Sequence, residues 1–313
     1  MSEQGVKKSM IMSVISMVIL FSIYWTSDSK SIGQIIIITV IGILLYGVNK
    51  RTYQQAEVSL SNGTTYRRLK PYRIKKRYYL WIVCITILLK TCITGILNLP
   101  SDTANEQRID EFLKNNPIIE SIINIGLLSP IVEEVISRGL LYMVCSGIVI
   151  LVFNRFFKHA GREHINKTTG ITFVIISSIT FGIPHVIRDG DYQNITPYII
   201  SGMVFSVLYV ITKTIYVPIL LHMLGNTMST LSSLFKMGLI EINIANGIAV
   251  FLLLYPLIGL LVWVWNIKND DELSKTSSAI DEEIKALGLN RSAATKRQLI
   301  EFFRYVKGQM TVK

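Results

Sequence analysis

The chain has 313 residues, of which 50% are hydrophobic and only 17% are charged, with a formal net charge of +11. Soluble domains carry about 25% charged residues, so this composition, with a mean hydropathy of +0.44, excludes an ordinary pair of soluble domains. The three cysteines, Cys84, Cys92 and Cys145, all fall in apolar segments, which excludes a disulfide framework.

Apolar segments of membrane-spanning length follow one another along the chain. A bilayer span needs about 20 mostly apolar residues. Segments of this kind lie at 10–25, 32–48, 79–99, 118–153, 171–186, 196–211, 217–235 and 244–265. We therefore predict an all-α, polytopic membrane bundle of about eight transmembrane helices with a short helical tail. Gly126 and Pro130 predict a kink or a division in the long fourth segment.

Positive charge gathers in the connections that this topology places on one side of the membrane. Segment 49–77 is strongly basic and interleaved with tyrosines. A nucleic-acid patch is one interpretation, but a cytoplasmic loop beside anionic headgroups explains the same pattern and is favoured. Segment 154–169 is also basic, whereas loop 100–117 is poor in positive charge and is placed outside. We expect a multi-pass cell-membrane protein with lipid as a partner, no bound nucleic acid and both termini in the cytoplasm.

These features divide the chain into four parts. The N-terminal spans and the basic loop occupy 1–117, and a membrane core occupies 118–235. A last span lies in 236–267, and a soluble cytoplasmic tail follows at 268–313. Apolar residues of the tail recur at helical spacing, which predicts one or two short amphipathic helices.

Ionisable side chains inside the predicted spans are few. They are Lys90, Glu120, Glu133, Glu134, Arg138, His185 and His222. Such groups are expensive at membrane depth and usually mark a functional site. His159 and His164, in the basic loop, are interpreted as ordinary loop histidines.

The first polar motif is Glu133-Glu134-x-x-x-Arg138. Glu134 and Arg138 are four residues apart, so a helix places them on one face. Glu133 points about 100° away from Glu134. The motif therefore predicts either a buried pair that locks the bundle, or one anchored glutamate and one that faces a reaction.

Two further motifs lie on later spans. His185 follows Phe181 by four residues and comes directly after Pro184, whose missing donor disturbs a helix. His222 and Asn226 share a helical face, and an asparagine can donate to a developing oxyanion. The alternatives are an interfacial histidine and ordinary hydrogen bonding between helices.

Together these motifs carry a resemblance. Glu-Glu-x-x-x-Arg, Phe-x-x-x-His and His-x-x-x-Asn, in this order, resemble the CPBP family of CAAX proteases and bacteriocin-processing enzymes, also called Abi proteins. The resemblance covers 118–233 and implies a catalytic four-helix core at 118–235 and an intramembrane endopeptidase. By motif position it implies that the catalytic residues are Glu133, Glu134, Arg138, His185, His222 and Asn226.

Two mechanisms fit these residues. In one, His185, His222 and Glu134 hold a zinc ion that activates water. In the other, no metal takes part: a glutamate acts directly as the base with His185, while His222 and Asn226 bind the oxyanion. The second is favoured because the motifs lack the His-Glu-x-x-His helix of many zinc proteases.

The expected substrate is a membrane-associated peptide or protein, in bacterial peptide maturation or bacteriocin immunity. The alternatives are a non-catalytic membrane regulator or scaffold of the same family, and a transporter with a buried acidic pair, which the lack of internal repeats disfavours. The topology places His185 toward the outer end of its span and His222 toward the inner end. Their depths in the membrane would then differ by up to roughly 10 Å, which is too far for one site.

Overall fold

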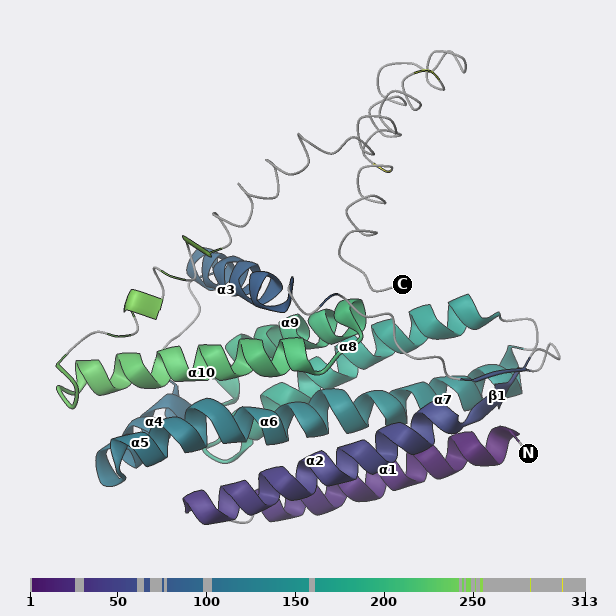
Figure 1. Ribbon diagram of the computed structural model, residues 1–313, viewed down its shortest axis with the longest axis horizontal. Helices are drawn as coiled ribbons and strands as arrows, with labels where there is room; N and C mark the ends of the chain where they lie inside the picture. Colours follow the sequence, from purple (N-terminus) through teal and green to yellow (C-terminus); the bar gives the residue numbers. More distant parts are fainter. Residues whose placement is uncertain are drawn as a thin grey trace.

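In the computed structural model the chain forms a bundle of long helices (Figure 1). The structure describes residues 2–25, 31–60, 65–67, 75, 78–97, 103–157 and 161–241, and beyond them residues 244, 246–248, 251, 254, 255, 282 and 300. Within this part the all-helical class is confirmed, apart from one pair of three-residue strands. The predicted eighth span and the tail lie almost entirely outside the described residues.

The first two helices, α1 (Ser2–Trp25) and α2 (Ile32–Gln55), pack along each other. Their interface is polar where Asn49 donates from Nδ2 to Ser16 Oγ over 2.8 Å and accepts at Oδ1 from Ser13 Oγ over 3.2 Å. All three side chains are buried. Membrane bundles use such interhelical hydrogen bonds to hold helices together where the lipid gives no hydrophobic drive.

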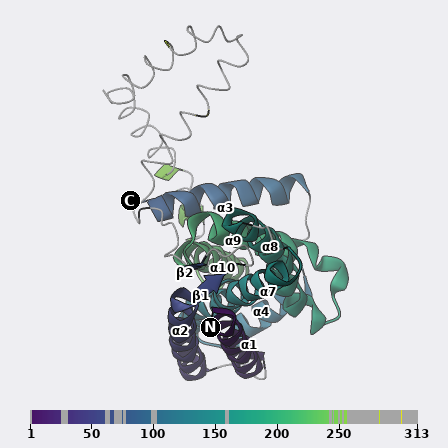
Figure 2. The same ribbon diagram turned by 90° about the vertical axis from the view of Figure 1, so that its right-hand side faces the viewer.

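The predicted basic loop contains regular structure. Helix α2 continues into it, and β1 (Glu57–Ser59) pairs antiparallel with β2 (Thr65–Arg67). Helix α3 (Tyr79–Ile96) follows. Viewed along the bundle, α3 lies on the side opposite α1 and α2 (Figure 2).

The segment 100–117, predicted as an outer loop, contains the polar helix α4 (Ala104–Asn115). The prediction of a loop is therefore wrong in part. The N-cap of α4 is Thr103, whose Oγ1 accepts from the Glu106 backbone N–H over 3.2 Å. The segment 104–115 contains no apolar run of the length that marks a span. Capping by threonine and an amphipathic pattern on a short helix were the available signals.

One continuous helical stretch of 39 residues runs from Ile118 to Phe156. Its parts are α5 (Ile118–Ser121), η2 (Ile122–Leu128), α6 (Ser129–Glu134), η3 (Val135–Leu140) and α7 (Leu141–Phe156). The predicted division at Gly126 and Pro130 is therefore absent. Instead η2 and η3 are π-helical, a form that often occurs at functional sites.

The remaining helices complete the bundle. They are α8 (Arg162–Ile187), the short η4 (Tyr192–Asn194), α9 (Thr196–Thr212) and α10 (Tyr216–Lys236). Pro184 does not end α8, because it lies in the last turn, where one lost donor disturbs little.

Six helical stretches among the described residues are long and apolar enough to cross a membrane, and they correspond to the first six predicted spans. Helix α10, the predicted seventh, is not one of the six, so the count of eight is not confirmed. Side chains such as Ile37 and Leu44 on α2 are about 60% exposed, at 61% and 62%, as lipid-facing residues are. The chain is a multi-pass membrane protein.

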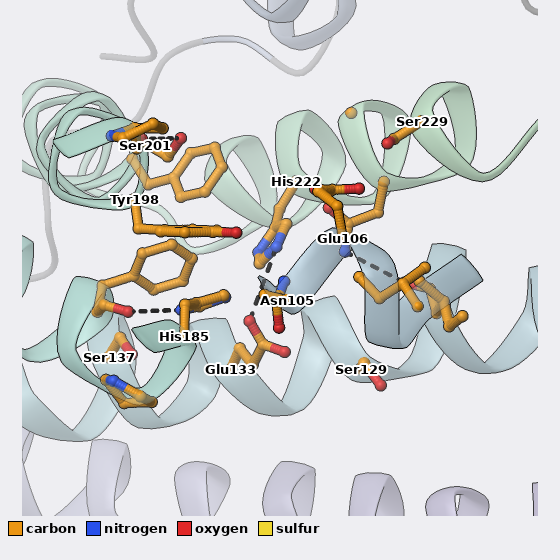
Figure 3. A pocket seen from close by; sticks show the side chains of 18 of the residues that line it. Asn105, Glu106, Ser129, Glu133, Ser137, His185, Tyr198, Ser201, His222 and Ser229 are labelled. Carbon is orange, nitrogen blue, oxygen red and sulfur yellow. Dashed lines mark hydrogen bonds and ion pairs between the residues drawn. The ribbon is translucent and has the colours of Figure 1, made fainter. Parts of the chain in front are cut away.

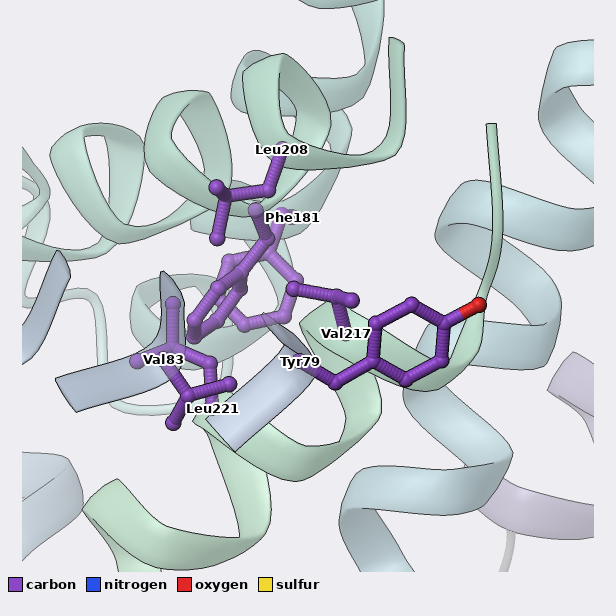
Figure 4. Close-up of a cluster of buried hydrophobic side chains, with 7 residues drawn as sticks. Tyr79, Val83, Phe181, Leu208, Val217 and Leu221 are labelled. Carbon is purple, nitrogen blue, oxygen red and sulfur yellow. The ribbon is translucent and has the colours of Figure 1, made fainter. Parts of the chain in front are cut away.

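An apolar cluster joins α3, α8, α9 and α10 next to the polar motifs (Figure 4). Val83 of α3, Val217 and Leu221 of α10 and Phe181 of α8 are all buried in it. Leu221 directly precedes His222, and Phe181 lies one turn before His185. Packing of this cluster therefore fixes the two helices that carry the histidines.

Gly202 is expected to be intolerant of a side chain. A Cβ there would lie 3.0 Å from the Cα and carbonyl oxygen of Ser178, which are backbone atoms of α8 and cannot rotate away. We expect Gly202→Ala to destabilise the protein by about 1–3 kcal/mol, a typical cost of overpacking. Thermal unfolding in detergent measures this, with Gly47→Ala as the control because nothing lies within 4 Å of a Cβ there. Equal melting temperatures for the two variants would show that α8 and α9 are not packed as described.

Candidate active site

The predicted pair of Glu134 and Arg138 is present and fully buried. Arg138 Nη1 donates to Glu134 Oε1 over 3.1 Å, and both side chains have 0% exposure. Arg138 Nη2 donates to the Gly202 carbonyl on α9 over 3.1 Å. The guanidinium also lies over the rings of Phe181 and Phe205, at 4.4 and 5.0 Å from their centroids. Arg138 therefore joins the helix of the glutamates to α8 and α9.

His222 of α10 meets both glutamates. Its Nδ1 lies 2.9 Å from Glu134 Oε1, and because a carboxylate accepts, Nδ1 is the donor. Its Nε2 lies 3.7 Å from Glu133 Oε2. Phe205 stacks on the imidazole with centroids 4.8 Å apart, and Phe181 meets it edge-on at 5.6 Å. The ring is thus fixed in orientation by one carboxylate and two aromatic rings.

Glu133 is the more accessible of the two glutamates, with a side chain 20% exposed. Tyr24 of α1 donates from its hydroxyl to Glu133 Oε1 over 2.7 Å. Glu133 Oε2 has no hydrogen-bond partner. Sequence reasoning missed Tyr24, because it lies on α1, outside the three motifs, and no spacing rule connects it to Glu133.

His185 is held by its own helix and by α9. Its Nδ1 lies 2.8 Å from the Phe181 carbonyl, so Nδ1 donates and Nε2 is left as an acceptor. The imidazole stacks on Tyr198, with centroids 4.6 Å apart and planes 19° apart. Phe181 contacts both histidine rings, at 4.8 Å from His185 and 5.6 Å from His222. Phe181 therefore joins the two histidines, which the sequence predicts at different depths.

Asn226 lies one turn after His222 and reaches the π-helical segment η2. Its Nδ2 donates to the Ile125 carbonyl over 3.2 Å. Close packing makes this possible, since a Cβ on Gly126 would lie only 2.7 Å from Thr227 Oγ1. One N–H of the Asn226 amide is used in this contact, and the second remains available to a ligand.

A cavity of about 890 Å³ connects these groups. Glu133, His185, His222 and Asn226 line it, together with Tyr24, Lys90, Asn105, Glu106, Phe181, Tyr198 and Phe205. Glu134 and Arg138 are not in its lining. Figure 3 shows His222 and Glu133 facing one another across the cavity, with His185 and Tyr198 at one end.

Residues 115–228 match the family model described as "Type II CAAX prenyl endopeptidase Rce1-like". This segment belongs to the CPBP family. The matched range contains all three motifs, and the resemblance predicted from them is confirmed. No curated protein and no solved structure matches the chain.

Members of the CPBP family are intramembrane proteases, which accords with a cavity that holds ionisable side chains inside an apolar bundle. The match ends at residue 228, so the end of α10 and everything after it lie outside the CPBP segment.

The predicted zinc set does not fit the CPBP site as its side chains stand. Among the described residues, no group of three His, Cys, Asp or Glu side chains is placed to hold a metal. Glu134 does not line the cavity with the two histidines, and its Oε1 already accepts from Arg138 and His222. A structural or catalytic zinc needs at least three converging ligands. No catalytic step is therefore derived through a metal.

Other candidate residues lie apart from the CPBP site. Glu120 Oε1 accepts from the Ile32 backbone N–H over 3.0 Å at the start of α2. Cys145 is buried, and His164 is exposed on α8. His159 lies outside the described residues.

The partly buried carboxyl of Glu106 on α4 should make the stability of the folded protein depend on pH. Burial raises the pKa of its carboxyl above the ordinary value of 4.5, and Asp110 raises it further, while Lys90 and Lys236 lower it. A carboxyl with a raised folded-state pKa binds its proton more tightly in the folded protein, so stability is lost as the pH rises from 4.5 through the folded-state pKa. We expect Glu106→Gln to raise the melting temperature in detergent at neutral pH and to have no such effect below pH 4.5. If the melting temperature of Glu106→Gln exceeded that of wild type by more at acidic pH than at neutral pH, this prediction would be wrong.

Proposed function

We propose that this protein is an intramembrane endopeptidase that hydrolyses a peptide bond in a membrane-associated protein or peptide. The observation that carries the proposal is Glu133, which lines an 890 Å³ cavity and whose Oε2 has no hydrogen-bond partner and lies 3.7 Å from His222 Nε2. A base needs such an oxygen within reach of water and substrate.

The two glutamates take different roles in this proposal. Glu134 is fully buried, outside the cavity lining, and fixed by Arg138 and His222. Glu133 lines the cavity and is oriented by Tyr24. Glu133 is therefore the base, and Glu134 orients His222.

Hydrolysis then proceeds in two proton transfers. Water lies between Glu133 Oε2 and His185 Nε2, which is the acceptor left on that ring. Glu133 takes a proton as the water oxygen attacks the carbonyl carbon, and it returns that proton to the leaving amine nitrogen when the C–N bond breaks. Protonated His222, through Nε2–H, and the second Asn226 N–H stabilise the oxyanion between these steps.

The biological role extends the same proposal. The isoleucine- and lysine-rich chain is typical of bacterial membrane proteins, and it favours leader peptides, bacteriocins or signalling peptides as substrates. We place the protein in bacterial peptide maturation or bacteriocin immunity.

Cleavage of a candidate membrane peptide by the purified protein in liposomes tests the proposal. We expect Asn226→Ala to lower kcat by about 10²–10³-fold, the usual cost of removing one oxyanion donor, with KM little changed. His185→Ala is expected to lose activity on a similar scale. The matched control is Asn166→Ala, because Asn166 is exposed on α8 and does not line the cavity. Full activity in both cavity variants would show that this cavity does not carry the reaction, and no cleavage by folded wild-type protein would favour a non-catalytic regulator instead.

A further inference from the structure

Helix α4 covers one end of the cavity. The α4 residues in the cavity lining are Asn105, Glu106, Arg108, Ile109 and Phe112. In Figure 3 Asn105 and Glu106 lie beside His222 and Glu133. A substrate peptide that enters from this end must displace α4.

Polar contacts to the connection between α8 and α9 hold α4 in place. The Ala104 backbone N–H donates to Asp191 Oδ2 over 3.0 Å, and Arg108 Nη2 pairs with Asp189 Oδ2 at 2.9 Å. Leu113 is the one buried side chain among the described residues of α4. Helices shorter than about 12–15 residues are marginal on their own. Because α4 has 12, its position depends on these contacts.

Tyr198 contacts both α4 and the catalytic candidate His185. Its hydroxyl and Thr103 Oγ1 are 2.6 Å apart, and Thr103 is the N-cap of α4. Its ring stacks on the imidazole of His185 at 4.6 Å. The His185 ring also meets Phe181 at 4.8 Å. The imidazole therefore contacts two aromatic rings, one of which is tied to α4.

We propose that α4 is a lid over the catalytic cavity and that Tyr198 is a positioning residue that couples lid closure to the orientation of His185. When α4 docks, the bond to Thr103 fixes the Tyr198 ring, and the ring holds His185 Nε2 toward the water. When α4 leaves, Tyr198 loses that bond and its ring is no longer fixed, so the contacts that still fix the His185 imidazole are those with the carbonyl and the ring of Phe181. The assignment of His185 rests on the proposed function, whereas the lid does not.

Four substitutions separate the two contacts of Tyr198. Tyr198→Phe removes the bond to Thr103 but keeps the stack, and we expect it to lower kcat by about 3–10-fold, the scale of one lost hydrogen bond, because the stacked ring is no longer fixed. Tyr198→Leu removes both, and we expect kcat to fall by about 10–100-fold, since small misplacements of a catalytic group cost this much. Thr103→Val removes the same bond and also the N-cap of α4, so its effect should be at least as large as that of Tyr198→Phe. Thr103→Ser keeps the hydroxyl and the cap, and should match wild type.

Hydrogen exchange of the backbone amides of α4 reports on the lid without any need for activity. We expect exchange in 104–115 to rise about 3–10-fold in Tyr198→Phe and Thr103→Val, while α7 is unchanged. Tyr192→Phe is the matched control, because Tyr192 is 58% exposed and does not line the cavity.

The outcomes are distinct. If wild type cleaves peptide but Tyr198→Leu keeps the wild-type kcat, the positioning role is wrong although the proposed function stands. If exchange in α4 is the same in Tyr198→Phe and in Tyr192→Phe, the lid is not held by Tyr198. If wild type cleaves nothing, the proposed function fails, and the exchange measurement still decides whether α4 is coupled to Tyr198.

Discussion

Replacing Glu133 by glutamine is expected to lower kcat by about 10²–10⁴-fold, the range that a general base contributes. The amide keeps the shape of the carboxylate and its oxygen can still accept from the Tyr24 hydroxyl, so the fold should be unaffected. What is lost is the oxygen that takes the proton from water. Initial rates of peptide cleavage in liposomes, together with thermal unfolding in detergent, measure the two effects separately.

The control for this substitution is Glu163→Gln, which makes the same change on an exposed carboxylate at the start of α8. It should leave both rate and melting temperature unchanged. A Glu133→Gln variant that folds and retains more than about a tenth of the wild-type kcat would rule out Glu133 as the base.

Replacing Arg138 by methionine is expected to cost about 3–5 kcal/mol in the free energy of unfolding, because it leaves a buried carboxylate without its cation. Glu134 and Arg138 both have 0% exposure, so no solvent replaces the lost partner. The Gly202 carbonyl also loses its donor. Unfolding in a denaturing detergent, followed by circular dichroism, gives the difference in stability.

The double variant Arg138→Met with Glu134→Gln tests the cause. Without the carboxylate charge the penalty for losing Arg138 falls, so the double variant should be more stable than Arg138→Met alone. If the two substitutions simply add, the pair does not interact and the buried ion pair is not what holds the bundle.

Much of the site could be predicted from the sequence, because the residues of each motif lie within one or two turns of a single helix. Glu134 and Arg138 are four residues apart on a helix, and so are His222 and Asn226. The apolar surroundings made each of these residues conspicuous. Helical spacing predicted which side chains share a face, and the structure agrees for the Glu134–Arg138 pair.

Contacts between distant helices could not be predicted in the same way. Tyr24 and Tyr198 are ordinary aromatic residues of membrane helices, and only the packing of the bundle brings them to Glu133 and His185. Helix α4 was missed because it is short and mostly polar, and because its contacts with Asp189 and Asp191 come from a distant connection.

The errors at helix boundaries have a similar physical origin. A hydropathy pattern reports residues that face lipid, whereas a helix continues into polar segments where its backbone is satisfied. Helix α8 therefore begins at Arg162, nine residues before the apolar run at 171. The spans also placed His185 and His222 toward opposite ends of their helices, whereas a shared contact with Phe181 joins them in the structure.

Product analysis in isotopically labelled water tests most directly whether this cavity hydrolyses peptide bonds. Wild-type protein in liposomes is incubated with membrane-associated peptides in water enriched in oxygen-18, and the products are identified by mass spectrometry. We expect a new carboxyl terminus that carries one labelled oxygen with wild type and with Glu163→Gln, and none with Glu133→Gln. Equal labelled product from Glu133→Gln and wild type, or no product from folded wild-type protein with any of the peptides, would contradict the assignment of an endopeptidase that uses Glu133 to activate water.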